Sequence, residues 1–356
     1  MTGMQDKPQP GDRPLPATLR DVARAAGVSP ATASRALNGS SRNVRAENVS
    51  RVLAAAASLD YVPHLSAQAT AKGSTRTAAL VVSGIDDPYF SSIAAGVAQG
   101  ADAAGLTVTM AVSERSPERE LQIVRTLRGQ RPRVIILAGS RIDGTGTREA
   151  LIEELDAYRT AGGSVVMVSQ PDLPFGTVSI ENAEGARQLA RALVERGYRR
   201  FAVIWAGERI RTSRDRYDGF LAGLRESGAG IGDPLVLEAA FTRAGGYAAA
   251  RDLASRGLDG VELVFAVNDV MAIGAMTALR DAGLVPGEDV AVAGFDDIGS
   301  AVDLVPMLTS VSVPLHEVGL RAMECALSDL DAAEVVQIPT SVVLRDSTPR
   351  RMPPAP

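Results

Sequence analysis

Residues 18–39 read TLRDVARAAGVSPATASRALNG, and this stretch carries the start and stop signals of two short helices. Thr18 can cap a first helix, whose apolar residues recur at i, i+3, i+4 and i+7. Gly27 ends that helix, because glycine adopts the left-handed conformation of a helix C-terminus at little cost. Ser29 can cap a second helix, with Pro30 in its first turn, where a missing amide costs nothing. The stretch therefore predicts a helix-turn-helix.

Charge is distributed unevenly along the chain, although the formal net charge of its 356 residues is only −5. Between residues 17 and 76, eight Lys and Arg residues stand against three Asp and Glu residues, a net charge of +5. Residues 1–16 balance, so the rest of the chain carries −10. A compact basic segment is typical of proteins that approach phosphate, and it predicts strongly salt-dependent DNA binding.

The composition divides the chain into segments. We expect a disordered leader over 1–16, a helix-turn-helix DNA-binding domain over 17–62 with a third helix at about 46–59, and a hinge or linker over 63–76. A large body follows over 77–348, and a disordered tail over 349–356.

The body shows short β-rich apolar runs that alternate with amphipathic helices, a pattern typical of βαβ units and parallel sheets. The expected strands are 78–83, 106–112, 133–137, 164–169, 200–205, 235–239, 262–267 and 289–294. The expected helices are 89–104, 117–129, 149–161, 183–196, 213–227, 244–257, 270–283 and 315–330. The two sets of strands predict two sheets, so the fold class is an all-α head followed by an α/β body.

Several functional classes are excluded by what the chain lacks. Its one cysteine, Cys325, and two histidines, His64 and His316, allow neither an intrachain disulfide nor a Cys/His zinc cage, and we expect no metal and no cofactor. No apolar run approaches the roughly 20 residues that span a bilayer, so we expect no membrane partner. The polar, proline-rich leader does not have the pattern of a secretion signal, and we expect a cytoplasmic, nucleoid-associated protein.

Five motifs together resemble the LacI/GalR (lactose-repressor) family of bacterial transcription regulators. They are the stretch 18–39 quoted above, VLAAAASLDYVPH at 52–64, RYDGF at 216–220, VNDVMAIGAM at 267–276 and VAGFDDI at 292–298. The resemblance covers about residues 18–345. It implies a two-lobed, periplasmic-binding-protein-like body with lobe 1 at about 77–178 and 312–335, and lobe 2 at about 179–311 and 336–348. It also implies a homodimeric repressor of double-stranded operator DNA, controlled by a small-molecule effector such as a sugar or related metabolite.

The resemblance assigns base reading to Pro30, Ala31, Ser34 and Arg35. Pro30 and Ala31 can make only apolar contacts, whereas Arg35 can bind guanine through two hydrogen bonds. Phosphate contact and register are expected of Thr18, Ser29, Thr32, Asn38 and Tyr61.

The hinge segment departs from the family pattern. By resemblance, Ala67 and Gln68 would lie in the minor groove, and Thr70 stands where the family usually places a leucine wedge. Threonine is a poor wedge, so whether the hinge inserts between base steps and bends the DNA stays open.

Ligands of α/β proteins bind at the carboxyl ends of parallel strands, in the crevice between lobes. Residues that follow strand ends or lie in the family's motifs give the effector-site candidates Asp87, Tyr89, Phe90, Ser140, Ser169, Gln170, Arg216, Phe241, Asn268 and Asp296. The resemblance assigns hydrogen bonding to Arg216, Asn268 and Asp296, and stacking to Phe90 and Phe241. Two alternatives stay open, in which Asp296 caps a turn and Phe90 belongs to the core.

An enzyme is the competing class for an α/β body. The sequence SGIDDPYF after the first strand is not the glycine-rich turn of a dinucleotide site, and no nucleophile elbow or P-loop is present, so we expect no catalytic activity. A cytoplasmic solute-binding module with an idle head is the other alternative. A dimer is favoured over a tetramer, because LRDSTPRRMPPAP at the C-terminus contains no apolar heptad.

Overall fold

The computed structural model describes residues 17–37, 44–61, 75–144, 146–228, 231–328 and 334–351. It separates into two compact units, residues 1–72 and 73–356, here called the head and the body. The expected leader over 1–16 and nearly all of the expected hinge lie outside the described residues. No helix in the described part of the chain combines the length and the apolar character that crossing a membrane requires.

The head is the expected three-helix unit, with α1 (Leu19–Ala26), α2 (Pro30–Leu37) and α3 (Ala46–Ser58). Gly27 ends α1 in the left-handed conformation at φ 64°, as the sequence predicts. Small apolar residues from all three helices form the core, which consists of Val22, Ala23, Ala26, Ala33, Ala36, Val52, Ala55 and Ala56. The helix-turn-helix prediction is confirmed.

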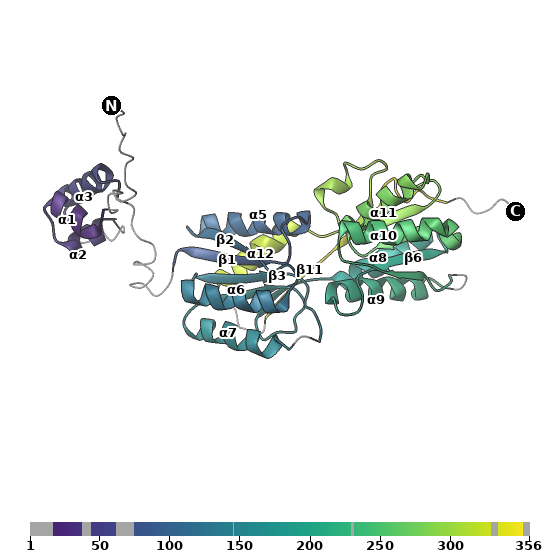
Figure 1. Ribbon diagram of the computed structural model, residues 1–356, viewed down its shortest axis with the longest axis horizontal. Helices are drawn as coiled ribbons and strands as arrows, with labels where there is room; N and C mark the ends of the chain where they lie inside the picture. The colour runs from purple at the N-terminus through teal and green to yellow at the C-terminus, as the bar shows by residue number, and fades with distance from the viewer. Residues whose placement is uncertain are drawn as a thin grey trace, which may run out of the picture. The chain divides into compact units, whose positions relative to one another are not determined.

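The first lobe of the body holds a six-stranded parallel sheet in the order β11-β5-β4-β3-β1-β2. The strands are β1 (Thr77–Val82), β2 (Thr107–Val112), β3 (Val134–Ala138), β4 (Ser164–Val168), β5 (Gly176–Ile180) and β11 (Val335–Ile338). One face packs on α5 (Pro88–Ala103) and α12 (Leu315–Leu327), and the other packs on α6 (Pro117–Gln130) and α7 (Arg148–Thr160). In Figure 1, α12 lies beside α5 although the two come from opposite ends of the body sequence.

The second lobe holds another six-stranded sheet, in the order β12-β10-β9-β8-β6-β7. The strands are β6 (Phe201–Trp205), β7 (Leu235–Glu238), β8 (Leu263–Ala266), β9 (Ala291–Asp296), β10 (Thr309–Ser312) and β12 (Ser341–Val343), and of these β12 alone runs antiparallel to its neighbour. Its helices pack as two pairs, α8 (Asn182–Glu195) with α9 (Arg211–Glu226), and α10 (Arg243–Ser255) with α11 (Asp269–Asp281).

The chain passes between the two sheets three times: from β5 to α8, from β10 to α12, and from β11 to β12. The expected lobe boundary at 178 therefore falls inside β5. The expected assignment of 336–348 to the second lobe is wrong for 336–338, because β11 pairs with β5 in the first sheet, with Val335 opposite Thr177. Residue 312, expected in the first lobe, ends a strand of the second sheet.

All eight expected strands are present with each end within two residues of the prediction, and so are the helices, apart from α12, which ends at Leu327. The prediction missed β5, β10, β11 and β12. The disordered tail is also wrong for residues 349–351, because Tyr198 donates a hydrogen bond to the Pro349 carbonyl at 2.7 Å and the Arg351 amide donates to Arg196 O at 2.8 Å.

Close packing of helix pairs depends on glycine. A Cβ atom on Gly96 of α5 would lie 2.0 Å from the His316 carbonyl oxygen of α12, and one on Gly319 of α12 would lie 2.1 Å from the Ile93 carbonyl oxygen. These two glycines let the backbones of α5 and α12 approach each other, which a side chain at either position would prevent.

Candidate functional site

A cavity of about 40 Å³ lies between the two lobes, and nine of the ten effector-site candidates line it. These nine are Asp87, Tyr89, Phe90, Ser140, Ser169, Arg216, Phe241, Asn268 and Asp296. The structure adds Arg115 and Thr212 to the polar part of the wall. Residues far apart in the sequence thus meet at the carboxyl ends of the strands of both sheets.

Asp87 and its neighbours form the first-lobe wall at the start of α5. The Asp87 carboxylate caps this helix by accepting the Tyr89 amide hydrogen bond at 3.0 Å, and burial raises the pKa of Asp87. The Phe90 ring meets the Tyr89 ring edge-on at a centroid distance of 5.0 Å. Phe90 is buried in the lobe core and also lines the cavity, so it belongs both to the core and to the candidate effector site.

Arg216 is the central cation of the second-lobe wall and is 1% exposed. Its Nε donates to Asn182 Oδ1 at 2.8 Å, its Nη1 to Val267 O at 2.8 Å, and its Nη2 to Asp296 Oδ1 at 2.7 Å. The guanidinium also lies 3.8 Å from the centroid of the Phe295 ring. A guanidinium has five N–H donors, so this arrangement leaves two of them for a ligand.

Asp296, at the end of β9, is buried beside Arg216. Burial raises the pKa of Asp296 to about 7, against the opposing pull of the Arg216 charge. Its backbone is left-handed, with φ 114°, and that of Asp297 follows with φ 55°. The turn after β9 is held by Asp269 instead, whose carboxylate accepts hydrogen bonds from the Ile298 amide at 2.9 Å and the Ser310 hydroxyl at 2.7 Å.

Asn268 and Phe241 complete the second-lobe wall. The Asn268 side-chain oxygen Oδ1 caps α11 by accepting the Met271 amide hydrogen bond at 2.9 Å. This leaves the side-chain NH2 group to donate to a ligand. Phe241 is half-buried and packs under the Arg115 guanidinium at 5.3 Å. The cavity therefore combines two carboxylates, two guanidiniums, an amide and three aromatic rings.

Gln170 is the tenth candidate, and the structure places it in a contact between the lobes. Its Nε2 donates to Thr212 Oγ1 at 3.0 Å and to Asp215 Oδ2 at 3.1 Å. Ser140 Oγ accepts the Thr212 amide hydrogen bond at 3.0 Å. Thus two residues after strands of the first sheet hold the start of α9.

The same contact continues through the loop after β3. Ile142 forms an isolated antiparallel bridge with Ile210, and the Asp143 carboxylate binds Arg211 Nε at 2.6 Å and Arg214 Nη1 at 3.0 Å. We call Ser140, Ile142, Asp143, Gln170, Ile210, Arg211, Thr212 and Arg214 the interlobe latch.

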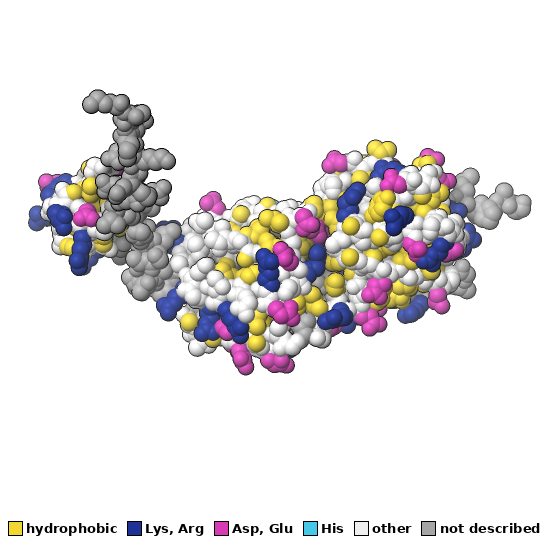
Figure 2. Space-filling view, in the orientation of Figure 1, with side chains coloured by type: hydrophobic (Ala, Val, Ile, Leu, Met, Phe, Trp, Pro, Cys, Tyr) yellow, Lys and Arg dark blue, Asp and Glu magenta, His cyan; other side chains and the backbone are white. Residues whose placement is uncertain are grey.

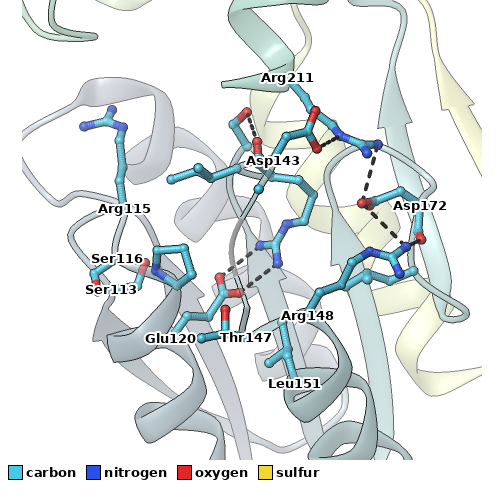
Figure 3. Close-up of a pocket in the computed structure, with 16 residues that line it drawn as sticks. Ser113, Arg115, Ser116, Glu120, Asp143, Thr147, Arg148, Leu151, Asp172 and Arg211 are labelled. Carbon is cyan, nitrogen blue, oxygen red and sulfur yellow. Dashed lines mark hydrogen bonds and ion pairs between the residues drawn. The ribbon is translucent and has the colours of Figure 1, made fainter. Parts of the chain in front are cut away.

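A second cavity of about 110 Å³ lies beside the latch. Figure 3 shows its charged side chains, which form two sets of ion pairs. Arg141 binds Glu120 through two hydrogen bonds of 2.7 and 2.9 Å, and Asp172 lies between Arg148 and Arg211. No cluster of three or more metal-ligating side chains occurs among the described residues of either cavity or elsewhere.

In the head, some candidates for DNA contact are exposed on α2, and others cap the N-terminus of a helix. Pro30, Ala31 and Arg35 are exposed on α2, and Thr32 and Ser34 are half-buried. Ser29 Oγ accepts the Thr32 amide hydrogen bond at 3.1 Å.

Two other head candidates have structural contacts. Thr18 forms a capping box with Asp21, and Tyr61 packs partly against the head core. Figure 2 shows Arg side chains on the surface of the head. The candidates Asn38, Ala67, Gln68 and Thr70 lie outside the described residues.

The head and the body both match known protein families. The model for bacterial regulatory proteins of the lacI family matches residues 18–64, and that for a periplasmic binding protein-like domain matches residues 190–348. The chain is 30% identical to the HTH-type transcriptional regulator GalR of Escherichia coli over 90% of this chain and 92% of that protein. It is 32% identical to the regulator CelR of Thermobifida fusca over 92% of this chain and 95% of that protein.

Solved structures show the same relationship. The lac repressor dimer bound to operator and the anti-inducer ONPF is 25% identical, with a TM-score of 0.79, over 94% of this chain and 100% of that one. A complex of the transcriptional regulator CelR with cellobiose is 29% identical, with a TM-score of 0.67, over 93% of this chain and 99% of that one. The similarity therefore covers both the head and the two-lobed body.

Proposed function

The chain belongs to the lacI family of bacterial regulatory proteins, and on this premise we propose that it is a DNA-binding transcriptional repressor whose operator affinity is set by a small-molecule effector. The observation that carries the proposal is the convergence of nine candidate residues on one interlobe cavity, in a chain that also carries a helix-turn-helix.

DNA recognition falls to α2. Its exposed face offers the apolar surfaces of Pro30 and Ala31 and the guanidinium of Arg35, and its start carries Ser29 and Thr32 for phosphate. Arg51 has a different role, because its guanidinium donates to the Ala26 carbonyl and so holds the end of α1.

The effector is a small polyhydroxylated molecule, in the simplest case a sugar. Asp87 and Asp296 can accept hydrogen bonds from hydroxyl groups, Arg216 and Asn268 can donate to them, and Phe241 offers a flat apolar face. The relative crystallised with cellobiose supports this class of ligand.

The two sites are coupled through the body. A ligand that binds one arrangement of the lobes more tightly shifts the population toward it, and the operator and the effector then change each other's affinity by the same factor. We propose a homodimer, in line with the relative crystallised as a dimer on its operator. The exposed apolar side chains Val302, Val305 and Met307 of the second lobe offer a surface for the second copy.

We assign the protein no catalytic activity and no cofactor. The assignment follows the relatives, which are transcriptional regulators. We place its action in the cytoplasm, on chromosomal DNA.

The test is DNA binding by the full chain, measured by fluorescence anisotropy on the DNA upstream of its own gene, with and without a panel of sugars, polyols and nucleobases. We expect salt-dependent, saturable binding that one class of the panel changes, and loss of that change in Asp296→Ala. Effector binding without binding to any DNA would instead indicate a solute-binding module with an idle head.

A further inference from the structure

Arg115 stands on the wall shared by the two cavities. Arg115 and Ser140 line both the cavity of about 40 Å³ and that of about 110 Å³. Arg115 lies in the loop between β2 and α6, a strand end that contributed no candidate to the sequence prediction.

The other three arginines of the second cavity donate hydrogen bonds to neighbouring residues. Arg141 donates two to Glu120, Arg211 donates one to Asp143 and lies 3.4 Å from Asp172, and Arg148 donates one to the Asp172 backbone carbonyl. Figure 3 shows these interactions as dashed lines, and Arg115 stands apart from them. These three guanidiniums therefore have structural roles in the wall of the second cavity.

Arg115 has weaker contacts. Its guanidinium is 3.9 Å from Asp87 and 5.3 Å from the Phe241 ring centroid, and it donates no hydrogen bond to any residue in the described part of the chain. Its side chain is 28% exposed. Burial lowers the pKa of Arg115, so an anionic partner would stabilise its charged form. The N–H donors of this cation are thus available to a ligand.

The backbone at Arg115 adopts an unfavourable conformation. Glu114 and Arg115 are consecutive non-glycine residues in the left-handed region, with φ 54° and 56°. Such residues persist where the surrounding structure enforces them, and they concentrate at ligand sites. Ser116, which follows, caps α6 and lines the second cavity, so the positive end of a 14-residue helix lies next to the guanidinium.

From this geometry we propose that Arg115 is a specificity residue that binds an anionic group, a phosphate or a carboxylate, carried by the polyhydroxylated effector. This inference rests on the proposed function, because the remainder of the effector occupies the first cavity. A guanidinium binds carboxylate and phosphate oxygens through paired hydrogen bonds, a geometry that no hydroxyl group matches.

The test is isothermal titration calorimetry on the full chain with three arms: glucose, galactose and ribose; their phosphate esters; and the sugar acids glucuronate and galacturonate. The variants are Arg115→Gln, Arg115→Lys, and Arg125→Gln as the control. Arg125 lies on α6, the helix that follows Arg115, and its variant also loses one positive charge, but Arg125 pairs with Glu154 outside both cavities. The phosphate and acid arms distinguish the two anionic groups.

We expect one anionic arm to bind the wild type and Arg125→Gln about 10- to 100-fold more tightly than its neutral parent. Arg115→Gln should lose this preference while still binding the neutral sugar, which shows that it is folded, and Arg115→Lys should retain part of the preference. Equal affinity for neutral and anionic ligands in the wild type, or an unchanged preference in Arg115→Gln, would overturn the inference and leave the proposed function standing. Failure of all three arms on the wild type would overturn both.

Discussion

Asp143, in the loop that follows β3 of the first lobe, accepts a hydrogen bond from Arg211 of the second lobe at 2.6 Å. Arg214 adds a second bond to the same carboxylate at 3.0 Å, and both arginines lower the pKa of Asp143 below its ordinary value. One carboxylate thus ties the start of α9 to the opposite lobe, beside the effector cavity.

Removal of this carboxylate should weaken effector binding. In Asp143→Ala the joined arrangement of the lobes loses its two ion pairs, and the fraction of binding-competent protein falls. Because such exposed pairs contribute up to about 1 kcal/mol each, we expect about 2- to 10-fold weaker affinity by calorimetry. Asp156→Ala is the matched control, since Asp156 pairs with Arg159 within α7 and touches no residue of the latch. Equal affinities in the two variants would show that the latch does not govern binding.

The buried carboxyl of Asp296 should make the stability of the body depend on pH. Its pKa is about 7 in the folded protein and near 3.8 when unfolded, so the folded form binds the extra proton between these values. The free energy of unfolding should therefore decrease as pH rises from about 4 to about 7, and then level off. Burial raises the pKa of Asp269 and Asp87 as well, which acts in the same direction.

Urea unfolding of the wild type and of Asp296→Asn between pH 4 and pH 8 measures this effect. The variant should be less stable, because Arg216 loses the negative charge of its partner, but its stability should change less between pH 4 and 7. Parallel pH profiles for the two proteins would assign the dependence to other groups.

Gly96 should tolerate no side chain. In Gly96→Ala the new Cβ meets the His316 carbonyl at 2.0 Å, so α5 and α12 must separate, and we expect a loss of about 1–3 kcal/mol or more in the free energy of unfolding. Gly129→Ala is the control, because Gly129 lies in α6 with no neighbouring atom within 4 Å of the added carbon. There the lower conformational entropy of the unfolded chain should leave stability unchanged or increase it by about 0.5–1 kcal/mol. Urea unfolding of both variants tests the packing of the two helices.

Arg35 should read a base. Arg35→Ala should cost about 1–3 kcal/mol of operator affinity and relax the preference at one base pair, measured by anisotropy against operators with single substitutions. Arg24→Ala serves for comparison, since Arg24 is exposed on α1 and lies outside the predicted reading face. A uniform loss across all operators would reassign Arg35 to phosphate contact.

Apolar periodicity and helix caps in the sequence predict most of the fold, and the missed strands show where this signal ends. The strand β10 is short and polar, and it is buried only because its hydroxyl groups find partners: Ser310 donates to Asp269 at 2.7 Å, and Thr309 bonds Thr348 at 2.6 Å. Those partners are distant in sequence, so no local pattern can predict them. The strands β11 and β12 consist mostly of Val and Ile, but they are only four and three residues long, too short for a periodic apolar pattern to identify them.

The candidate site was predictable to a similar degree. The rule that ligand groups follow strand ends found Asp87, Ser140 and Ser169, and the same rule applied to the second strand would have found Arg115. The rule does not show which role each of these residues has. That Gln170 bridges the lobes, and that Asp269 rather than Asp296 holds the turn after β9, depends on the positions of neighbouring elements.

The chain passes between the two sheets three times, and this limits how recombination can change the effector specificity of the protein. Neither lobe is one continuous segment, so a single recombination event cannot exchange one lobe, and a new effector preference has to arise by substitution within the cavity. The head is continuous up to residue 72. One junction after the head is therefore enough to join this sensor to a different operator sequence, and the two specificities of the regulator can be changed independently.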